Sequence, residues 1–390
     1  PEPGRKPSRF GDQGQVAIVT TSTLGITSRS YANGSAGFFD VWFEPSLEYF
    51  ILRNISLGIE LDLVHQRTRS YSGDSLFENG FTRFGAGLHF GVNVPISKAF
   101  SVYPLAMVGF HHDEQTTKFV STAPGTTAVP FAPTTISRMG PWLSFEVPLL
   151  YHPVEHFFVG LAPAVYHDFA SAEQGSTVLT HSTEVEGRFV LGGYFDPRKT
   201  DADDDEPEPA ANDPAAKHSR FGDRGTVVLT EESAFHWRST SYPEGDSATN
   251  ISLDGGFDWF FTEHQSLGFG AFYSKTTSIS GASTTRLETD GEGLGILGRY
   301  GFVVPFYSWF SLYPRLALEY SIGSTSQGTF RSDNHALTAS IFVPVMFHLA
   351  THFFVGFGPS VSEDIVHVEG SAPQNRGTSF GASTLVGGWL

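Results

Sequence analysis

The chain contains the stretch His156-Phe157-Phe158-Val159-Gly160-Leu161-Ala162-Pro163 and, in its second half, the close match His352-Phe353-Phe354-Val355-Gly356-Phe357-Gly358-Pro359. In both stretches, large apolar side chains alternate with small ones. An alternation with a period of two belongs to a β-strand, because successive side chains of a strand point to opposite faces. The sequence therefore predicts a strand in each place and an internal repeat that relates the two.

Further segments match in the same order in both halves of the chain. They are Ser8-Arg9-Phe10-Gly11-Asp12 with Ser219-Arg220-Phe221-Gly222-Asp223, Val94-Pro95 with Val304-Pro305, Tyr103-Pro104 with Tyr313-Pro314, and Val190-Leu191-Gly192-Gly193-Tyr194-Phe195 with Leu385-Val386-Gly387-Gly388-Trp389-Leu390. The spacing between matched residues changes mostly between Pro104 and Pro148, where we expect a long loop, since loops absorb insertions. A chain of 390 residues built from two such copies predicts two domains.

Composition excludes several classes of protein. The chain has no cysteine, which excludes disulfides and thiolate catalysis, and its net charge of −17 argues against nucleic acid as a partner. No apolar run reaches the roughly 18 to 20 residues of a transmembrane helix. We interpret 1–14 as a disordered lead-in and 197–218 as an acidic, Pro- and Ala-rich linker, which leaves 15–196 and 219–390 as the domains.

Each domain contains eight segments with strand-like alternation. They lie at about 15–27, 37–52, 55–68, 82–95, 100–112, 137–151, 156–168 and 182–195, and then at about 225–237, 248–261, 266–276, 290–305, 309–323, 335–349, 353–365 and 377–390. Tight turns alternate with long Ser-, Thr- and Gly-rich loops, which we place at 28–36, 69–81, 113–136 and 169–181, with a shorter one at 324–334. This alternation is typical of a bacterial outer-membrane barrel, with the tight turns in the periplasm.

One face of each predicted strand is apolar and the other is small, polar or charged. In 82–95, for example, Phe84, Leu88 and Phe90 alternate with Gly85 and His89. Aromatic residues crowd the turn ends, as a membrane interface requires, whereas a soluble barrel or sandwich, the alternative, would need no such belt. The pattern resembles the eight-stranded outer-membrane barrels of the OmpA, OmpX and opacity-protein type, although the chain ends in Trp389-Leu390 where those families usually end in Phe.

The repeat allows two tandem eight-stranded barrels or one sixteen-stranded barrel. The linker of more than 20 residues, about 25 Å long as a flexible chain, favours two barrels, as do large apolar side chains on the inward face and the separate ending of each copy. Two barrels would fold independently, with lumens filled by side chains. The function predicted is then a structural or surface-binding protein of the Gram-negative outer membrane without an open pore, and the alternative is a single porin-like diffusion channel.

Charged residues on the inward faces predict a lumen charge network. Its members are Asp40, Glu44, Glu48, Glu60, Asp62, Arg83, His89, Glu146 and Arg188 in the first copy, and Asp254, Asp258, Arg299, Arg315 and Glu319 in the second. Charges in a narrow lumen must be paired or hydrogen-bonded. An internal salt-bridge network is the plainer interpretation, and a path for protons or ions is the other.

Two further groups of residues have the side-chain types of a chemical site. His111-His112-Asp113-Glu114 has metal-binding residue types but no ligand spacing, so we expect an exposed polar loop. His167-Asp168 with a loop serine could imitate a lipid-modifying enzyme, the third function considered, but nothing positions that serine. We expect no catalytic site, metal or cofactor. The partners expected are outer-membrane lipid and the barrel assembly machinery, and the ligand of the outer loops is unknown.

Overall fold

The computed structural model describes residues 9–19, 23–31, 36–72, 75–121, 133–169, 172–174, 177–179, 181–198, 220–230, 234–241, 246–280, 287–328, 330–369, 372–373 and 376–390. The regular structure in these ranges consists of β-strands, which confirms the predicted all-β class. No helix among the described residues is long and apolar enough to cross a membrane.

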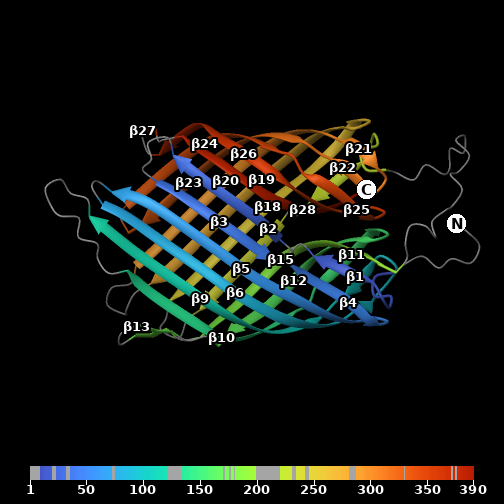
Figure 1. Ribbon diagram of the computed structural model, residues 1–390, viewed down its shortest axis with the longest axis horizontal. Coiled ribbons are helices and arrows are strands. Elements are labelled where there is room, and N and C mark those ends of the chain that lie inside the picture. Colours follow the sequence, from blue (N-terminus) through green and yellow to red (C-terminus); the bar gives the residue numbers. More distant parts are fainter. Residues whose placement is uncertain are drawn as a thin grey trace, which may run out of the picture.

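The strands run antiparallel and close into a single sixteen-stranded barrel (Figure 1). Several wall strands are interrupted near the tight turns and therefore carry two labels. The first half of the chain supplies β1 (Val16–Val19), β2 (Thr23–Tyr31), β3 (Ala36–Glu44), β4 (Ser46–Leu52), β5 (Ile55–Ser72), β6 (Ser75–Val92), β7 (Val94–Pro95), β8 (Phe100–Val102), β9 (Leu105–Ser121), β10 (Thr134–Glu146), β11 (Leu149–Val154), β12 (Phe157–Asp168), β13 (Ala172–Gln174), β14 (Thr177–Leu179) and β15 (Ser182–Phe195).

The second half of the chain supplies the other side of the wall. Its strands are β16 (Val227–Thr230), β17 (Ala234–Ser241), β18 (Ser247–Thr262), β19 (Gln265–Ser280), β20 (Leu287–Phe302), β21 (Val304–Tyr307), β22 (Phe310–Leu312), β23 (Arg315–Gln327), β24 (Phe330–Phe342), β25 (Val345–Ala350), β26 (Phe353–Glu369), β27 (Ala372–Pro373) and β28 (Gly377–Trp389). The small pair β13–β14 forms a separate sheet.

Two seams join the halves of the chain into one wall. β2 pairs with β28, from Gly25 opposite Ser383 to Tyr31 opposite Gly377, and β15 pairs with β17, from Thr183 opposite Ser241 to Arg188 opposite His236. The prediction of two tandem eight-stranded barrels is therefore wrong, and the alternative of one sixteen-stranded barrel is confirmed. The linker misled the prediction, because the length of a connection does not determine which strand edges pair.

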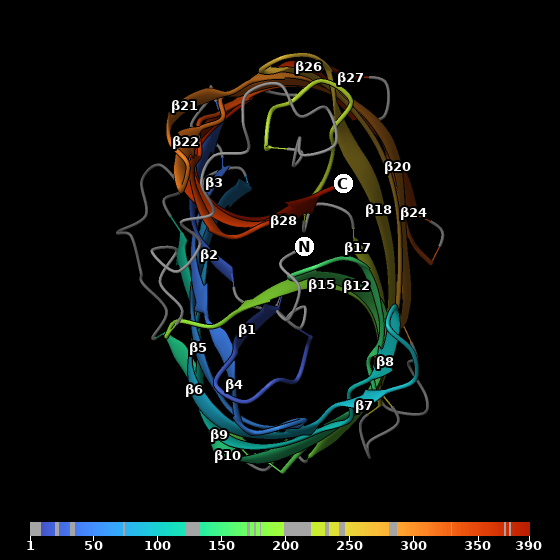
Figure 2. The same ribbon diagram turned by 90° about the vertical axis from the view of Figure 1, so that its right-hand side faces the viewer.

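Near the tight turns each half of the chain also pairs with itself. β1 lies between β4 and β15, and β16 lies between β18 and β28. The lumen thus forks at this end into two narrower spaces. We call them leg 1 (bounded by β1, β4, β5, β6, β8, β11, β12 and β15) and leg 2 (bounded by β16, β18, β19, β20, β22, β25, β26 and β28). Figure 2 looks onto this end and shows β15 and β28 crossing between the two lobes. The shared lumen on the long-loop side is called the vestibule.

The repeated stretch explains how the two legs are packed. Its first phenylalanines, Phe157 and Phe353, form a buried cluster with Leu191 and Val386, which lies where the two legs meet. Its second phenylalanine points the other way in each copy and belongs to the core of its own leg. The strand alternation therefore serves both the leg interiors and the contact between the legs.

Prolines mark the level at which the wall strands are interrupted. Pro104 separates β8 from β9, Pro148 separates β10 from β11, and Pro314 and Pro344 do the same in the second half. A proline cannot donate to a ladder, but its carbonyl still accepts, as in the 2.9 Å bond from Tyr103 N to Pro148 O. The same bond recurs at 3.0 Å from Tyr313 N to Pro344 O. We infer that both halves keep these prolines because the strands bend there from the wide barrel into the legs.

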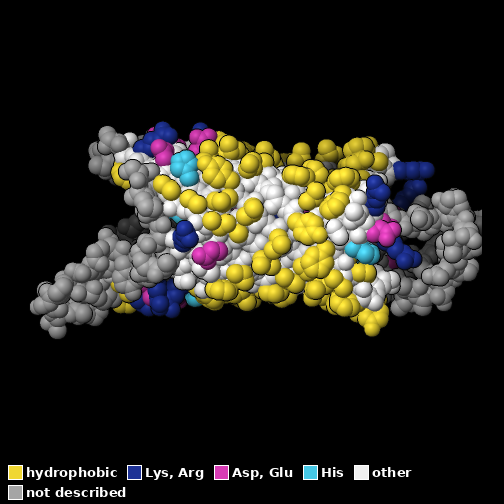
Figure 3. Space-filling view, turned by 90° about the horizontal axis from the view of Figure 1, so that it is seen from above, with side chains coloured by type: hydrophobic (Ala, Val, Ile, Leu, Met, Phe, Trp, Pro, Cys, Tyr) yellow, Lys and Arg dark blue, Asp and Glu magenta, His cyan; other side chains and the backbone are white. Residues whose placement is uncertain are grey.

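The outer surface of the barrel carries a band of exposed apolar side chains. Phe84, Leu88 and Ile296 are 57%, 63% and 62% exposed, and charged side chains gather toward the two ends (Figure 3). Aromatic side chains such as Tyr307 and Trp309 are exposed at the turn end. A closed barrel with such a surface is suited to the hydrocarbon of a membrane. The chain is an outer-membrane-type barrel, as predicted.

Several loops predicted from composition are in fact strand. β5 and β6 extend to Ser72 and from Ser75, so most of the predicted loop 69–81 belongs to a hairpin. Similarly, β9 and β10 include most of 113–121 and 134–136, and β23 and β24 shorten 324–334 to a turn. Ser and Thr are common strand residues at the polar rim, which is why composition alone placed these segments in loops.

Candidate functional site: the lumen and its closed ends

Ion pairs between the two halves cross both seams at the vestibule. Arg29 on β2 bonds Asp364 on β26, and Arg238 on β17 lies 3.4 Å from Glu184 and 3.6 Å from Glu186 on β15. His236 Nε2 is 3.4 Å from the same Glu186 carboxylate. These contacts give the vestibule charged residues from both halves of the chain at each seam.

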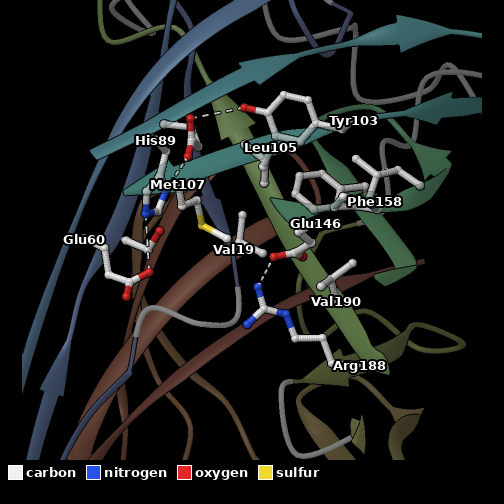
Figure 4. Close-up of a pocket in the computed structure, with 14 residues that line it drawn as sticks. Val19, Glu60, His89, Tyr103, Leu105, Met107, Glu146, Phe158, Arg188 and Val190 are labelled. Carbon is white, nitrogen blue, oxygen red and sulfur yellow. Dashed lines mark hydrogen bonds and ion pairs between the residues drawn. The ribbon is translucent and has the colours of Figure 1, made fainter. Parts of the chain in front are cut away.

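Three predicted network residues meet in leg 1. His89 Nδ1 lies 2.7 Å from Glu48 Oε1, and its Nε2 lies 3.4 Å from Glu60 Oε2 (Figure 4). The Glu48 side chain is 2% exposed and also accepts hydrogen bonds from Ser56 at 2.9 Å and Tyr103 at 3.2 Å. These partners satisfy a carboxylate that would otherwise be costly to bury.

A second cluster surrounds Asp113 above leg 1. Arg83 lies 2.8 Å from Asp113 and 3.6 Å from Asp62. Arg83 and Asp62, both members of the predicted network, are therefore paired. Arg138 lies 2.6 Å from Asp113 and 3.3 Å from Asp168. Sequence reasoning missed Asp113, Arg138 and Asp168 as lumen residues, although strand alternation continued past residue 112 could have found Asp113.

A third cluster joins β10 to β15. Arg188 bonds Glu146, whose side chain is 2% exposed, and lies 3.8 Å from Glu186. Arg188 thus links leg 1 to the seam residues of the vestibule.

In the second half, the predicted residues divide into a paired group and a separate one. Asp258 lies 3.1 Å from Arg299 and 3.6 Å from Arg315, and it accepts a 3.1 Å bond from Tyr313. Within the described ranges, no ion pair joins Asp254 or Glu319 to a basic group. In the first half, Asp40 and Glu44 lie on β3, and Glu44 is close enough to Asp62 of the second cluster to interact with it electrostatically.

One phenylalanine from each lead-in closes each leg. The Phe10 ring lies 5.1 to 5.5 Å from the rings of Phe50, Tyr103, His152, Phe158 and Tyr194. The Phe221 ring lies 5.1 to 5.7 Å from those of Phe260, Tyr313, His348, Phe354 and Trp389. Phe10 is 6% exposed, so this part of the predicted disordered lead-in is packed inside the barrel.

Phe10 and Phe221 each lie in a short turn, which we call the plug of its leg. Hydrogen bonds hold both plugs, and leg 1 has one that leg 2 lacks. Asn54 N donates to Gly11 O at 2.6 Å, and His264 N donates to Gly222 O at 2.7 Å. In leg 1 only, Asn93 Nδ2 also donates to Phe10 O at 2.8 Å, and the matching residue of leg 2 is Val303. Of the predicted linker 197–218, all but residues 197 and 198 lie outside the described residues.

Two cavities lie one above the other in the first half. The inner one, of about 30 Å³, sits among Phe158, Tyr103 and Glu48 and has room for water but not for a solute (Figure 4). The outer one, of about 320 Å³, is lined by charged side chains that include Arg238 from the second half. Both are lined by Glu60, Met107, Glu146 and Arg188, so they adjoin. The path from the vestibule therefore narrows to a closed end in leg 1.

The structure separates the other candidate groups. His111 and Asp113 are buried in β9, whereas His112 and Glu114, which alternate with them, are exposed, so this tetrad is a strand segment and not the expected polar loop. His167 Nδ1 lies 2.9 Å from Thr183 Oγ1, while its neighbour Asp168 is paired with Arg138. Among the described residues, no three His, Cys, Asp or Glu side chains are arranged to hold a metal. The expected absence of catalysis and of a cofactor stays a prediction.

Comparisons with known proteins give distant structural likenesses. No family model and no curated protein matches the chain. A crystal structure of a Pseudomonas aeruginosa FadL homologue is similar over 98% of this chain and 93% of that one, at 11% identity and a TM-score of 0.37. An outer membrane channel from Pseudomonas putida F1 covers 99% of each chain at 11% identity and a TM-score of 0.32, and the copper transporter OprC covers 98% and 82% at 10% and 0.35. With TM-scores below 0.5, these likenesses carry no argument about function.

Proposed function

We propose that the protein is an outer-membrane channel for small solutes, with one vestibule open on the long-loop side and two legs that are closed by plugs. The observation that carries the proposal is the pair of seams, because β2–β28 and β15–β17 merge what could have been two filled lumens into one wide space. A sixteen-stranded wall leaves more room than side chains alone fill. The partners are then outer-membrane lipid around the apolar band and the machinery that assembles such barrels.

The charged lining of the vestibule supports this proposal. A lumen that only had to be filled could use apolar residues, as both leg cores do. The vestibule instead carries ion pairs on strands of both halves, among them Arg29–Asp364 and Arg238–Glu184. Such a lining keeps water and polar solutes in the wide part of the barrel.

Planar-bilayer recordings of plug variants test the channel. We expect the wild-type protein to show rare openings, and Phe10→Ala or Phe221→Ala to make openings frequent, because each removes the ring at the centre of one leg's aromatic cluster. The double variant should show two conductance levels, one for each leg. Phe84→Ala, which changes an exposed ring on the outer band, is the matched control.

A closed surface-binding barrel is the second candidate, favoured by the aromatic cores that fill both legs. The same recordings separate the two. If the double plug variant folds and still conducts no more than wild type, the channel proposal fails and the binding protein replaces it.

A further inference from the structure

The cavity of about 320 Å³ in the vestibule lies beside the β15–β17 seam, directly outside leg 1. We call it the vestibule cavity; its lining includes Glu60, Asp62, Trp142, Tyr166, Glu184 and Arg238. Its volume lies at the lower end of the range for small-molecule sites. It shares four lining residues with the inner cavity of leg 1, so its chemistry bears on any solute that reaches that leg from the vestibule.

Carboxylates outnumber cations in the lining. Six carboxylates face four arginines: Glu60, Asp62, Glu146, Asp168, Glu184 and Glu186 against Arg83, Arg138, Arg188 and Arg238. Three of the arginines are closely paired, since Arg83 and Arg138 bond Asp113 at 2.8 and 2.6 Å and Arg188 bonds Glu146. The fourth, Arg238, lies 3.4 Å from Glu184 and 3.6 Å from Glu186. Histidines add to the cations, since His111 lines the cavity and Glu60 and Glu186 lie 3.4 Å from His89 and His236. The surplus of carboxylates is therefore centred on Asp62 and Glu184.

The surplus carboxylates have acceptor capacity left. Asp62 lies 3.6 Å from Arg83, and Glu184 lies 3.4 Å from Arg238. These distances exceed the roughly 2.7 to 2.9 Å of a charge-assisted hydrogen bond. In addition, Asp62 Oδ1 is buried and makes no hydrogen bond. A buried acceptor without a donor is uncommon in proteins and favours a ligand that brings an N–H group.

An aromatic wall supplies the second feature of the site. The Trp142 and Tyr166 rings lie 5.5 Å apart and line the cavity. A Cβ at Gly87 or Gly109 would come within 2.8 or 2.3 Å of Trp142, so the indole rests directly on two glycines and is held in place. Indole and phenol faces attract cations, and do so more strongly where water is excluded.

We propose that the vestibule cavity binds small organic cations with N–H donors, the class of primary ammonium compounds, and selects them for passage. This proposal rests on the proposed channel function and names its substrate class. The ammonium group lies against Asp62 and Glu184, and its alkyl chain lies along Trp142.

Calorimetric titration of the full-length protein in detergent tests the proposal with three probes of equal chain length: n-propylammonium, 1-propanol and propionate. We expect saturable binding of the cation alone. Asp62→Asn and Glu184→Gln should each weaken it about tenfold, which is the effect of losing about 1.4 kcal/mol of interaction. Asp254→Asn removes a carboxylate of the second half that does not line the cavity, and it should leave the affinity unchanged.

Equal binding of 1-propanol, preference for propionate, or unchanged affinity in both carboxylate variants would overturn the assignment. Binding in detergent needs no ion flow, so the two proposals can fail separately. If n-propylammonium binds as expected but the plug variants do not conduct, the channel fails and the cation site stands. If the plug variants conduct and the cation does not bind, only the cation site fails.

Discussion

At the scale of single residues, glycines on the inner wall make room for aromatic side chains that lie flat over the neighbouring strands. Trp142 lies over Gly87 and Gly109, Phe272 lies over Gly295, and Tyr313 lies against Gly301. A Cβ added at any of these glycines would come within 2.8 Å of the aromatic ring, so a larger residue has no room there. The alternating glycines visible in the sequence are thus sites of close packing and not only of flexible backbone.

Gly109→Ala should destabilise the barrel by roughly 1 to 3 kcal/mol, the usual cost of overpacking a filled interior. Its Cβ would lie 2.3 Å from the Trp142 ring and 2.5 Å from Ala86 O, and a backbone oxygen cannot move aside cheaply. Gly298→Ala is the matched control, because no heavy atom lies within 4 Å of the Cβ that it adds. Thermal unfolding in detergent should therefore show a lower midpoint for Gly109→Ala than for Gly298→Ala, and equal midpoints would contradict this packing argument.

The charged lumen residues show how much of the site can be predicted from the alternation of side chains along a strand. Strand alternation placed Glu48, His89 and Glu60 on inward faces, and the structure brings them into contact. Which carboxylate pairs with which cation depends on strand register and tilt, and a single sequence contains neither. Asp168 and Arg138 have the inward parity of Phe158 and Glu146 on β12 and β10, so alternation could have placed them in the lumen, whereas the contact between them depends on the register of these strands.

At the scale of elements, the strand order within each half was predictable and the seams were not. Tight turns fix neighbours such as β4 and β5, because a short connection forces antiparallel pairing. The partner of the first and last strand of each half has no such constraint. The first strand of each half is in fact divided: β1 pairs with β15 of its own half, while β2 pairs with β28 of the other. Local sequence carries no signal for that change of partner.

Cysteine pairs can report the seam directly, since the natural chain has no cysteine. Ser28 is opposite Phe380 across the β2–β28 seam. If the first half closed on itself along its whole length, the β1–β15 register that sets Val19 opposite Gly192 would instead bring Ser28 opposite Thr183. We expect Ser28→Cys with Phe380→Cys to form an intramolecular disulfide on mild oxidation, seen as a mobility shift on a denaturing gel.

The matched control is Ser28→Cys with Thr183→Cys, which should stay reduced under the same conditions. Both pairs share one cysteine, so differences in the reactivity of position 28 cancel. A disulfide in the control pair and none in the seam pair would restore the two-barrel arrangement.

At the scale of the whole molecule, the fork explains why the sequence favoured two barrels. Most of the large inward side chains that suggested filled lumens, among them Phe158, Tyr194, Phe354 and Trp389, belong to the leg cores near the tight turns, whereas Met107 and Leu297 do not. There the halves do close on themselves, as the repeat implied. The small and charged residues farther along the same strands line the shared vestibule, where the halves open toward each other.

The seams also determine how the halves should fold when they are separated. In the intact chain, β2 pairs with β3 of its own half on one side and with β28 of the other half on the other side. In the same way, the part of β15 far from the tight turns pairs with β12 of its own half and with β17 of the other half. Residues 1–200 refolded alone would keep the β1–β15 closure but leave these two edges unpaired at the depth of the membrane. Each unsatisfied backbone group in hydrocarbon costs several kcal/mol. Residues 215–390 would have the same defect at β17 and β28.

We therefore expect each half to aggregate or stay protease-sensitive in detergent, and the mixture of both to give a protease-resistant complex of one copy of each. Two protease-resistant monomers obtained without mixing would show that each half can close by itself, and would contradict the seams on which the shared vestibule depends.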